Sequence, residues 1–76
     1  MRRESQTLRF VLAQNIRRHR SRLGFSQEEL ADRCGLHRTY VGSVERCERN
    51  ATLSTLEALA DGLGVSADGL LREEKD

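Results

Sequence analysis

The sequence contains no proline and no tryptophan, and only one tyrosine and two phenylalanines among its 76 residues. The residue that most strongly breaks helices is therefore missing, and no stretch shows the apolar-polar alternation of a half-buried strand. Apolar residues instead recur at helical spacing between residues that cap helices. These features argue against a sheet-rich fold and predict an all-α fold.

Long apolar runs are also absent, since no stretch of about 18 apolar residues is long enough to span a bilayer. The N-terminal segment MRRESQTLRF has no apolar region of the kind found in secretory signals. Two cysteines, Cys34 and Cys47, are too few for a disulfide framework, so we expect reduced thiols. We therefore expect a soluble, cytoplasmic protein with no membrane partner.

A chain of this length forms one domain at most, so we expect a single domain over residues 1–76 with an ordered core at about 7–72. Charge is unevenly distributed along it. Residues 1–49 contain 11 Arg against 6 Asp and Glu, whereas residues 50–76 contain 2 basic and 6 acidic residues. A basic half of this kind suits a polyanion, although a solvated surface with ordinary ion pairs would show the same balance.

Five helices are expected from the apolar periodicity and the cap signals. They are placed at about 7–23, from Ser26 to Gly35, from about His37, from Thr52 to Leu63, and after Ser66 as a short last helix. The first should bury Leu8, Leu12, Ile16 and Leu23. The second begins with SQEE, a capping box in which Ser26 and Glu29 satisfy each other's backbone amides.

The second and third helices are joined by a short turn with three marked positions. Ala31 supplies a small side chain where two helices cross, Gly35 permits a positive φ, and Val41 anchors the next helix. Leu36 and Val41 have the spacing of a hydrophobic staple. The pattern predicts a helix-turn-helix, whose second helix is free to enter a DNA major groove.

The stretch SQEELADRCGLHRTYVGSVERCERNATLSTLEALADGLGVS resembles the DNA-binding domain of the Cro/C1-type (XRE) helix-turn-helix family. The likeness covers about residues 12–71. Within that family, RTYV followed by ERxxRN is similar to the controller proteins of restriction-modification systems. The resemblance implies a compact five-helix, lambda-repressor-like domain that regulates transcription without a cofactor and without enzymatic activity.

The resemblance also implies which side chains contact DNA. Base contacts are expected from the start and middle of the recognition helix, at Arg38, Thr39 and Ser43. Backbone contacts are expected at Gln27, Tyr40, Arg46, Arg49 and Asn50. Independent readings stay open, because Tyr40 also fits a half-buried core aromatic and the arginines also fit a solvated basic face.

Arg20 and Glu45 match family positions that form a partly buried ion pair between the first and third helices, so their expected role is structural. A homodimer is expected, with Leu70 and Leu71 at its interface, because a short terminal helix should not hide both leucines within one subunit. The expected partners are a pseudo-palindromic DNA operator, a second copy of the chain and, as a further candidate, RNA polymerase.

The chain departs from the family pattern at three places. Gly42 and Ser43 stand where the family usually shows serine and then glycine, which puts a base contact by Ser43 in doubt. Cys47 occupies a position where glycine often ends the recognition helix, and His19 a position that is commonly aliphatic. The cysteines and histidines match no standard metal-ligand spacing, so no metal is expected.

Two alternative functions remain at the level of sequence. One is a free-standing repressor of the same family. The other is an antitoxin that acts mainly through a protein partner, although antitoxins commonly add a partner-wrapping segment and only about five polar residues follow Leu71. No glycine-rich phosphate loop or nucleophile with a matching base suggests catalysis.

Overall fold

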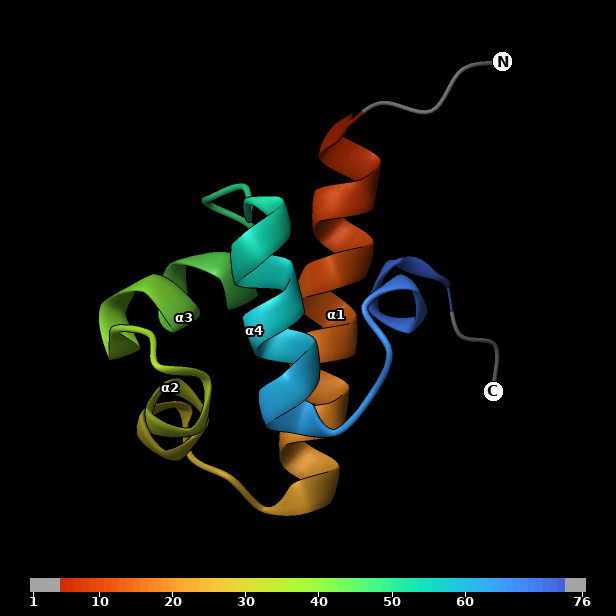
Figure 1. Ribbon diagram of the computed structural model, residues 1–76. Helices are drawn as coiled ribbons and strands as arrows, with labels where there is room; N and C mark the ends of the chain where they lie inside the picture. The colour runs from red at the N-terminus through yellow and green to blue at the C-terminus, as the bar shows by residue number, and fades with distance from the viewer. Residues whose placement is uncertain (1–4, 74–76) are drawn as a thin grey trace.

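A computed structural model describes residues 5–73 of the chain (Figure 1). Within this range it contains four α-helices, no β-strand and one short 3₁₀ helix. The elements are α1 (Ser5–Leu23), α2 (Gln27–Cys34), α3 (Arg38–Glu45), α4 (Leu53–Leu63) and η1 (Asp68–Leu71). Residues 1–4 and 74–76, the two ends of the expected domain, lie outside the described residues.

The expected fifth α-helix is wrong in kind, because the segment after Ser66 forms only one 3₁₀ turn. Its backbone bonds run from Leu70 N–H to the Ala67 carbonyl and from Arg72 N–H to the Gly69 carbonyl, three residues back in each case. Ala67 rather than Ser66 is the N-cap residue of this turn, although the Ser66 hydroxyl accepts from the Gly69 N–H at 3.2 Å. Four residues are too few to close a run of α-helical bonds.

The starts of α2 and α4 follow the expected cap chemistry. Ser26 and Glu29 form the reciprocal capping box at the start of α2, and Thr52 accepts from the Thr55 N–H before α4. His37, expected near the first helical residue, is instead the N-cap of α3, and its Nδ1 accepts from the Thr39 N–H at 3.2 Å.

The core is formed by one face of each helix. It contains Leu12, Ile16, Leu30, Ala31, Val41, Val44, Leu56, Leu59, Ala60, Leu63 and Leu70. The expected burial of Leu8 and Leu23 is wrong, because these side chains are 43% and 48% exposed. At about 1.5 Å per residue, α1 is about 28 Å long and α4 only about 16 Å, so the end turns of α1 extend past the elements that could cover them.

Leu70 is fully buried within its own subunit, which contradicts its placement at a dimer interface. The turn η1 packs against α1, on the side of α1 away from α2 and α3 (Figure 1). Asn15 of α1 fixes it there, because its Nδ2 donates to the carbonyls of Leu70 and Arg72, each at 2.8 Å. One short turn thus hides Leu70 and leaves Leu71 half-buried.

Among the described residues, none of the helices combines the length and the apolar composition that a membrane span requires.

Candidate nucleic-acid interface

The turn between α2 and α3 has the geometry of a helix-turn-helix. Gly35 adopts a left-handed conformation with φ +68°, and the Leu36 N–H bonds back to the Ala31 carbonyl at 2.9 Å. Ala31 and Val41 are buried, and Leu36 packs against the core that contains Val41. The glycine therefore turns the chain sharply, while the staple of Leu36 and Val41 fixes the direction of α3.

The first turn of α3 presents its side chains to solvent. Arg38 and Thr39 are exposed, and both line a pocket of about 240 Å³ that opens between α2 and α3. The other lining residues are Gln27, Gly42 and Arg46. The structure therefore brings the expected base-contacting pair together with two of the expected backbone-contacting residues.

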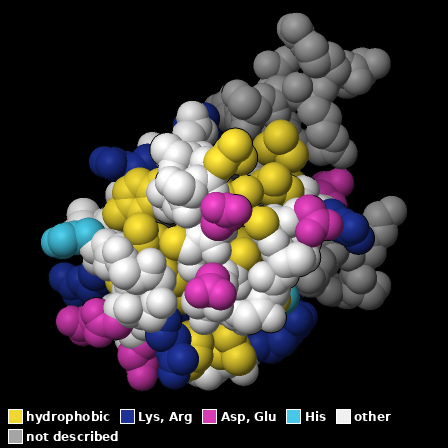
Figure 2. Space-filling view, in the orientation of Figure 1, with side chains coloured by type: hydrophobic (Ala, Val, Ile, Leu, Met, Phe, Trp, Pro, Cys, Tyr) yellow, Lys and Arg dark blue, Asp and Glu magenta, His cyan; other side chains and the backbone are white. Residues whose placement is uncertain are grey.

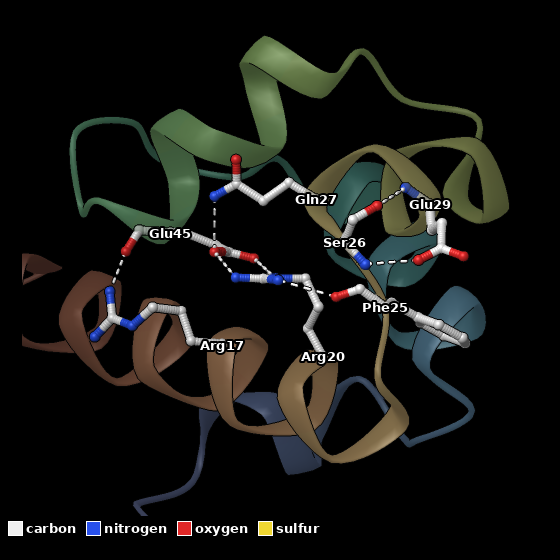
Figure 3. Close-up of polar contacts among 7 residues, drawn as sticks. All are labelled: Arg17, Arg20, Phe25, Ser26, Gln27, Glu29 and Glu45. Atoms are coloured by element: carbon white, nitrogen blue, oxygen red, sulfur yellow. Dashed lines mark hydrogen bonds and ion pairs between the residues drawn. The ribbon is translucent and has the colours of Figure 1, made fainter.

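A buried carboxylate holds Gln27, one of the residues that line this pocket (Figure 3). Glu45 is 2% exposed and accepts from Arg20 twice, from Nε at 2.6 Å and from a terminal nitrogen at 3.0 Å. Gln27 Nε2 donates to the same carboxylate at 3.0 Å. Arg20 also donates to the Phe25 carbonyl at 3.0 Å, so three hydrogen bonds hold its guanidinium group in one orientation.

The network links three helices, since Arg20 belongs to α1, Gln27 to α2 and Glu45 to α3. Arg17, one turn before Arg20, donates to the backbone carbonyl of Glu45 and adds a second tie from α1. Neither the bond from Gln27 nor the contact of Arg17 is part of the sequence expectations. The contact of Arg17 could have been predicted from the sequence, because Arg17 lies three residues before Arg20 and so on the same face of the helix.

Tyr40 has two sides, consistent with both interpretations left open by the sequence. Its ring is half-buried against the core. Its hydroxyl donates to the Asn50 carbonyl at 3.3 Å, and the Arg49 guanidinium lies 5.4 Å from the ring centroid. The side chains of Arg49 and Asn50 are otherwise exposed, so this edge of the site presents a guanidinium, an amide and a phenol together.

Ser43 does not lie on the exposed face where the base-contact expectation placed it. It is only 9% exposed, and its hydroxyl donates to the Thr39 carbonyl at 3.0 Å. Gly42, and not Ser43, lines the pocket. The serine that the family usually has at the first of these two positions is at the second position here, so its hydroxyl lies away from the pocket. We therefore do not retain Ser43 as a base-contacting residue.

Arg46 lies at the far rim of the pocket with its side chain 56% exposed. It forms an exposed ion pair with Glu48 at 3.2 Å. Such a pair in water is weak and easily exchanged for another anion. Arg46 can therefore turn toward a phosphate with little cost.

The two cysteines are free thiols that lie outside the pocket. Burial, followed by the nearby charge of Asp61, raises the pKa of the Cys34 thiol. Cys47 follows α3 in a left-handed conformation with φ +63°. In the part of the chain that the structure describes, no group of His, Cys, Asp and Glu is arranged to hold a metal ion.

Comparison with known proteins places this geometry in a family. A helix-turn-helix family model matches residues 16–70. The control protein C.SmaI of Serratia marcescens is 55% identical over 64 residues, which are 84% of this chain and 76% of that protein. The crystal structure of a hypothetical transcription factor from Neisseria superposes with a TM-score of 0.86 at 52% identity, covering 93% of this chain and 82% of that one.

A third similar structure is the restriction-modification controller protein C.Esp1396I, solved as a tetramer in complex with its natural 35 base-pair operator. It superposes with a TM-score of 0.77 at 36% identity, covering 83% of each chain. The chain described here belongs to the Cro/C1-type helix-turn-helix family, among relatives that include the controller proteins of restriction-modification systems.

Proposed function

We propose that this chain is a sequence-specific DNA-binding transcription regulator, the controller protein of a restriction-modification system. The observation that supports this most directly is the exposure of Arg38 and Thr39 on the first turn of α3, beside Gln27 at the start of α2. The relative C.Esp1396I, which binds its operator, has the same fold. Identity to C.SmaI over most of both chains supports the narrower assignment.

In this function Arg38 and Thr39 read bases in the major groove. A guanidinium can donate two bonds to the O6 and N7 atoms of guanine, and threonine offers a hydroxyl and a methyl group to a base edge. The backbone grip comes from residues on both sides of α3, namely Gln27, Tyr40, Arg46, Arg49 and Asn50. The network of Arg20, Gln27 and Glu45 holds α3 at a fixed angle to α2, so that both sets engage together.

The regulator acts as a homodimer, and its interface lies at an apolar groove rather than at Leu70. This groove, of about 330 Å³, is lined by Leu8, Arg9, Leu12, Asn50, Ala51, Leu53, Leu56 and Leu71. Leu53 is 81% exposed and Leu8 43% exposed. Apolar side chains gather on this face, where the first turn of α4 lies beside α1 (Figure 2). A second copy is the occupant that buries these leucines symmetrically.

Selection of bound sites from random duplex DNA tests the function. A dimer with one recognition helix per subunit should enrich a pseudo-palindrome whose half-sites lie about 34 Å apart, one turn of the double helix. An Arg38→Ala variant is the control, and it should lose the preference at one position of each half-site. Failure of the wild-type protein to enrich any sequence would favour a role in protein binding, as in an antitoxin.

A further inference from the structure

Gly42 lies in the middle of α3, where a glycine weakens a helix relative to alanine. The backbone does not require it, because Gly42 is not among the residues with a positive φ. The residue is buried, although its position on α3 faces the pocket at the proposed DNA interface. The side chains that pack over Gly42 are therefore the remaining explanation for a glycine at this position.

Two side chains cover Gly42. A Cβ atom at this position would lie 3.1 Å from a terminal nitrogen of Arg46 and 3.4 Å from Oε1 of Gln27. No backbone atom of another element is near enough to clash. The missing side chain thus gives space to the ends of Gln27 and Arg46 and to nothing else.

The groups around this space favour an anion. Arg38 and Arg46 contribute two guanidinium groups, Gln27 an amide and Thr39 a hydroxyl, and no carboxylate is among the lining residues. Two carboxylates contact these groups. Glu45 is 2% exposed and already accepts from Arg20 and Gln27. Glu48 forms an exposed ion pair with Arg46 at 3.2 Å, which a phosphate would have to replace. Gln27 has a second amide hydrogen that its bond to Glu45 does not use.

We propose that the pocket over Gly42 seats one phosphate of the DNA backbone, and that Gly42 is the positioning residue that sets its depth. The inference rests on the proposed function, because the phosphate belongs to the DNA bound there. The Arg46 guanidinium and the unused amide hydrogen of Gln27 can donate to the acceptor oxygens of a phosphate, while Arg38 remains directed at the bases. A larger residue at position 42 would lift Gln27 and Arg46 outward and hold the phosphate backbone farther from α3.

The order of Gly42 and Ser43 fits this role. The Ser43 hydroxyl donates to the Thr39 carbonyl four residues earlier, so this polar group is bonded within α3 and does not line the pocket. At the same time Gly42 has no side chain, so the ends of Gln27 and Arg46 can lie directly over its backbone. A serine at position 42 would bring its Cβ to 3.1 Å from a terminal nitrogen of Arg46, before its hydroxyl is counted.

The Gly42→Ala variant should stabilise the fold and weaken DNA binding. Because alanine favours the helix and meets only flexible side-chain ends, the thermal midpoint should rise by about 3 °C. Affinity for DNA should fall by about three- to tenfold, with a shallower dependence on salt. The loss should be equal on the selected operator and on a short duplex of scrambled sequence, because phosphates are common to both.

A double-variant cycle shows whether the effect runs through Arg46. In an Arg46→Ala background the pocket no longer contains that guanidinium, so adding Gly42→Ala should change affinity less than about twofold. Unchanged affinity and salt dependence for Gly42→Ala, or the same loss in both backgrounds, would overturn the inference. The proposed function is judged separately, by whether the wild-type protein discriminates the selected operator from the scrambled duplex.

Discussion

The polar pocket between α2 and α3 and the apolar groove beside α4 differ in how their side chains are held. In the pocket, Gln27 is bonded to the buried carboxylate of Glu45, which Arg20 also holds. In the groove, Leu53 is 81% exposed, although it is the first residue of a helix whose other leucines are buried. One region is already organised by contacts within the chain, and the other presents apolar surface that the chain does not cover.

The difference indicates two kinds of partner. Polar groups fixed in advance lose little freedom when a charged ligand arrives, which suits the rapid binding of DNA. Exposed leucines gain most from a partner that removes them from water. The two regions are close along the chain, because Arg46 lines the pocket and Asn50 and Ala51 line the groove. Variants that affect one region and leave the other unchanged test this division.

The largest effect is expected from Arg20→Ala. The variant leaves the Glu45 carboxylate buried without its cation, which should lower the free energy of unfolding by about 3 kcal/mol. DNA affinity should fall as well, because Gln27 and α3 lose their common anchor. Urea denaturation and gel shift measure the two losses, and an unfolding cost below about 1 kcal/mol would show that the pair behaves as a surface ion pair.

An Arg20→Leu, Glu45→Leu double variant is the matched control. Replacing a buried ion pair by apolar residues is often nearly neutral for stability, so most of the lost free energy of unfolding should return. DNA binding should remain weak, because Gln27 still has no carboxylate to orient it. Recovery of both properties would contradict a role for the network in positioning the pocket.

Arg38→Ala and Arg46→Ala distinguish base contacts from phosphate contacts within the pocket. Arg38→Ala should cost about 1 to 3 kcal/mol on the selected operator and relax the preference at one base position. Arg46→Ala should weaken binding to all sequences alike and reduce the salt slope by about one. Gel shifts over a salt series on operator and scrambled duplexes distinguish them. Equal losses on both duplexes for Arg38→Ala would remove it from the reading role.

The helix-turn-helix could be predicted from sequence because its signals are local. A small residue at Ala31, a left-handed turn at Gly35 and a staple from Leu36 to Val41 each depend on a few neighbouring positions. The fate of Leu70 could not be predicted in this way. It depends on Asn15, 55 residues earlier in the chain, whose side chain bonds to the Leu70 carbonyl and draws η1 onto α1.

Within the site, too, local features could be predicted from the sequence and contacts between distant residues could not. Exposure of Arg38 and Thr39 follows from their place on the first helical turn, which sequence spacing gives directly. The inward turn of Ser43 depends on which of two adjacent positions faces the pocket, a difference of one residue on α3. The bond between Gln27 and Glu45 joins α2 and α3, and the sequence of either helix alone does not determine the angle at which the two cross.

Leu53→Glu should affect the groove alone. A charge at this exposed position would be buried against the second copy, so dimer formation should weaken by about 2 kcal/mol, while the monomer keeps its stability. Light scattering over a concentration series measures the dimer. Leu23→Glu is the matched control, because Leu23 is 48% exposed but does not line the groove. Equal weakening by both variants, or by neither, would place the interface elsewhere.

The segment that joins the two regions begins at Cys47, and its backbone is strained. In residues 5–73 a residue with positive φ lies just past the end of each α-helix. It is a glycine directly after α1, α2 and α4, at positions 24, 35 and 64, and it is Cys47, one residue beyond Arg46, after α3. The end of α3 has the paired bonds of a Schellman motif, from Glu48 N–H to the Ser43 carbonyl at 2.9 Å and from Cys47 N–H to the Val44 carbonyl at 3.0 Å. A side chain at this position costs energy that a glycine avoids.

Cys47→Gly should therefore raise the free energy of unfolding by about 1 kcal/mol, after the larger freedom of glycine in the unfolded chain is allowed for. Cys47→Ala is the control, because it removes the sulfur and keeps the unfavourable φ, so it should not stabilise. Urea denaturation compares the two, and equal effects would show that the sulfur rather than the backbone matters. Since Cys47 lines neither the pocket nor the groove, DNA affinity and dimerisation should stay unchanged in both variants. A change in either would mean that this turn couples the two regions.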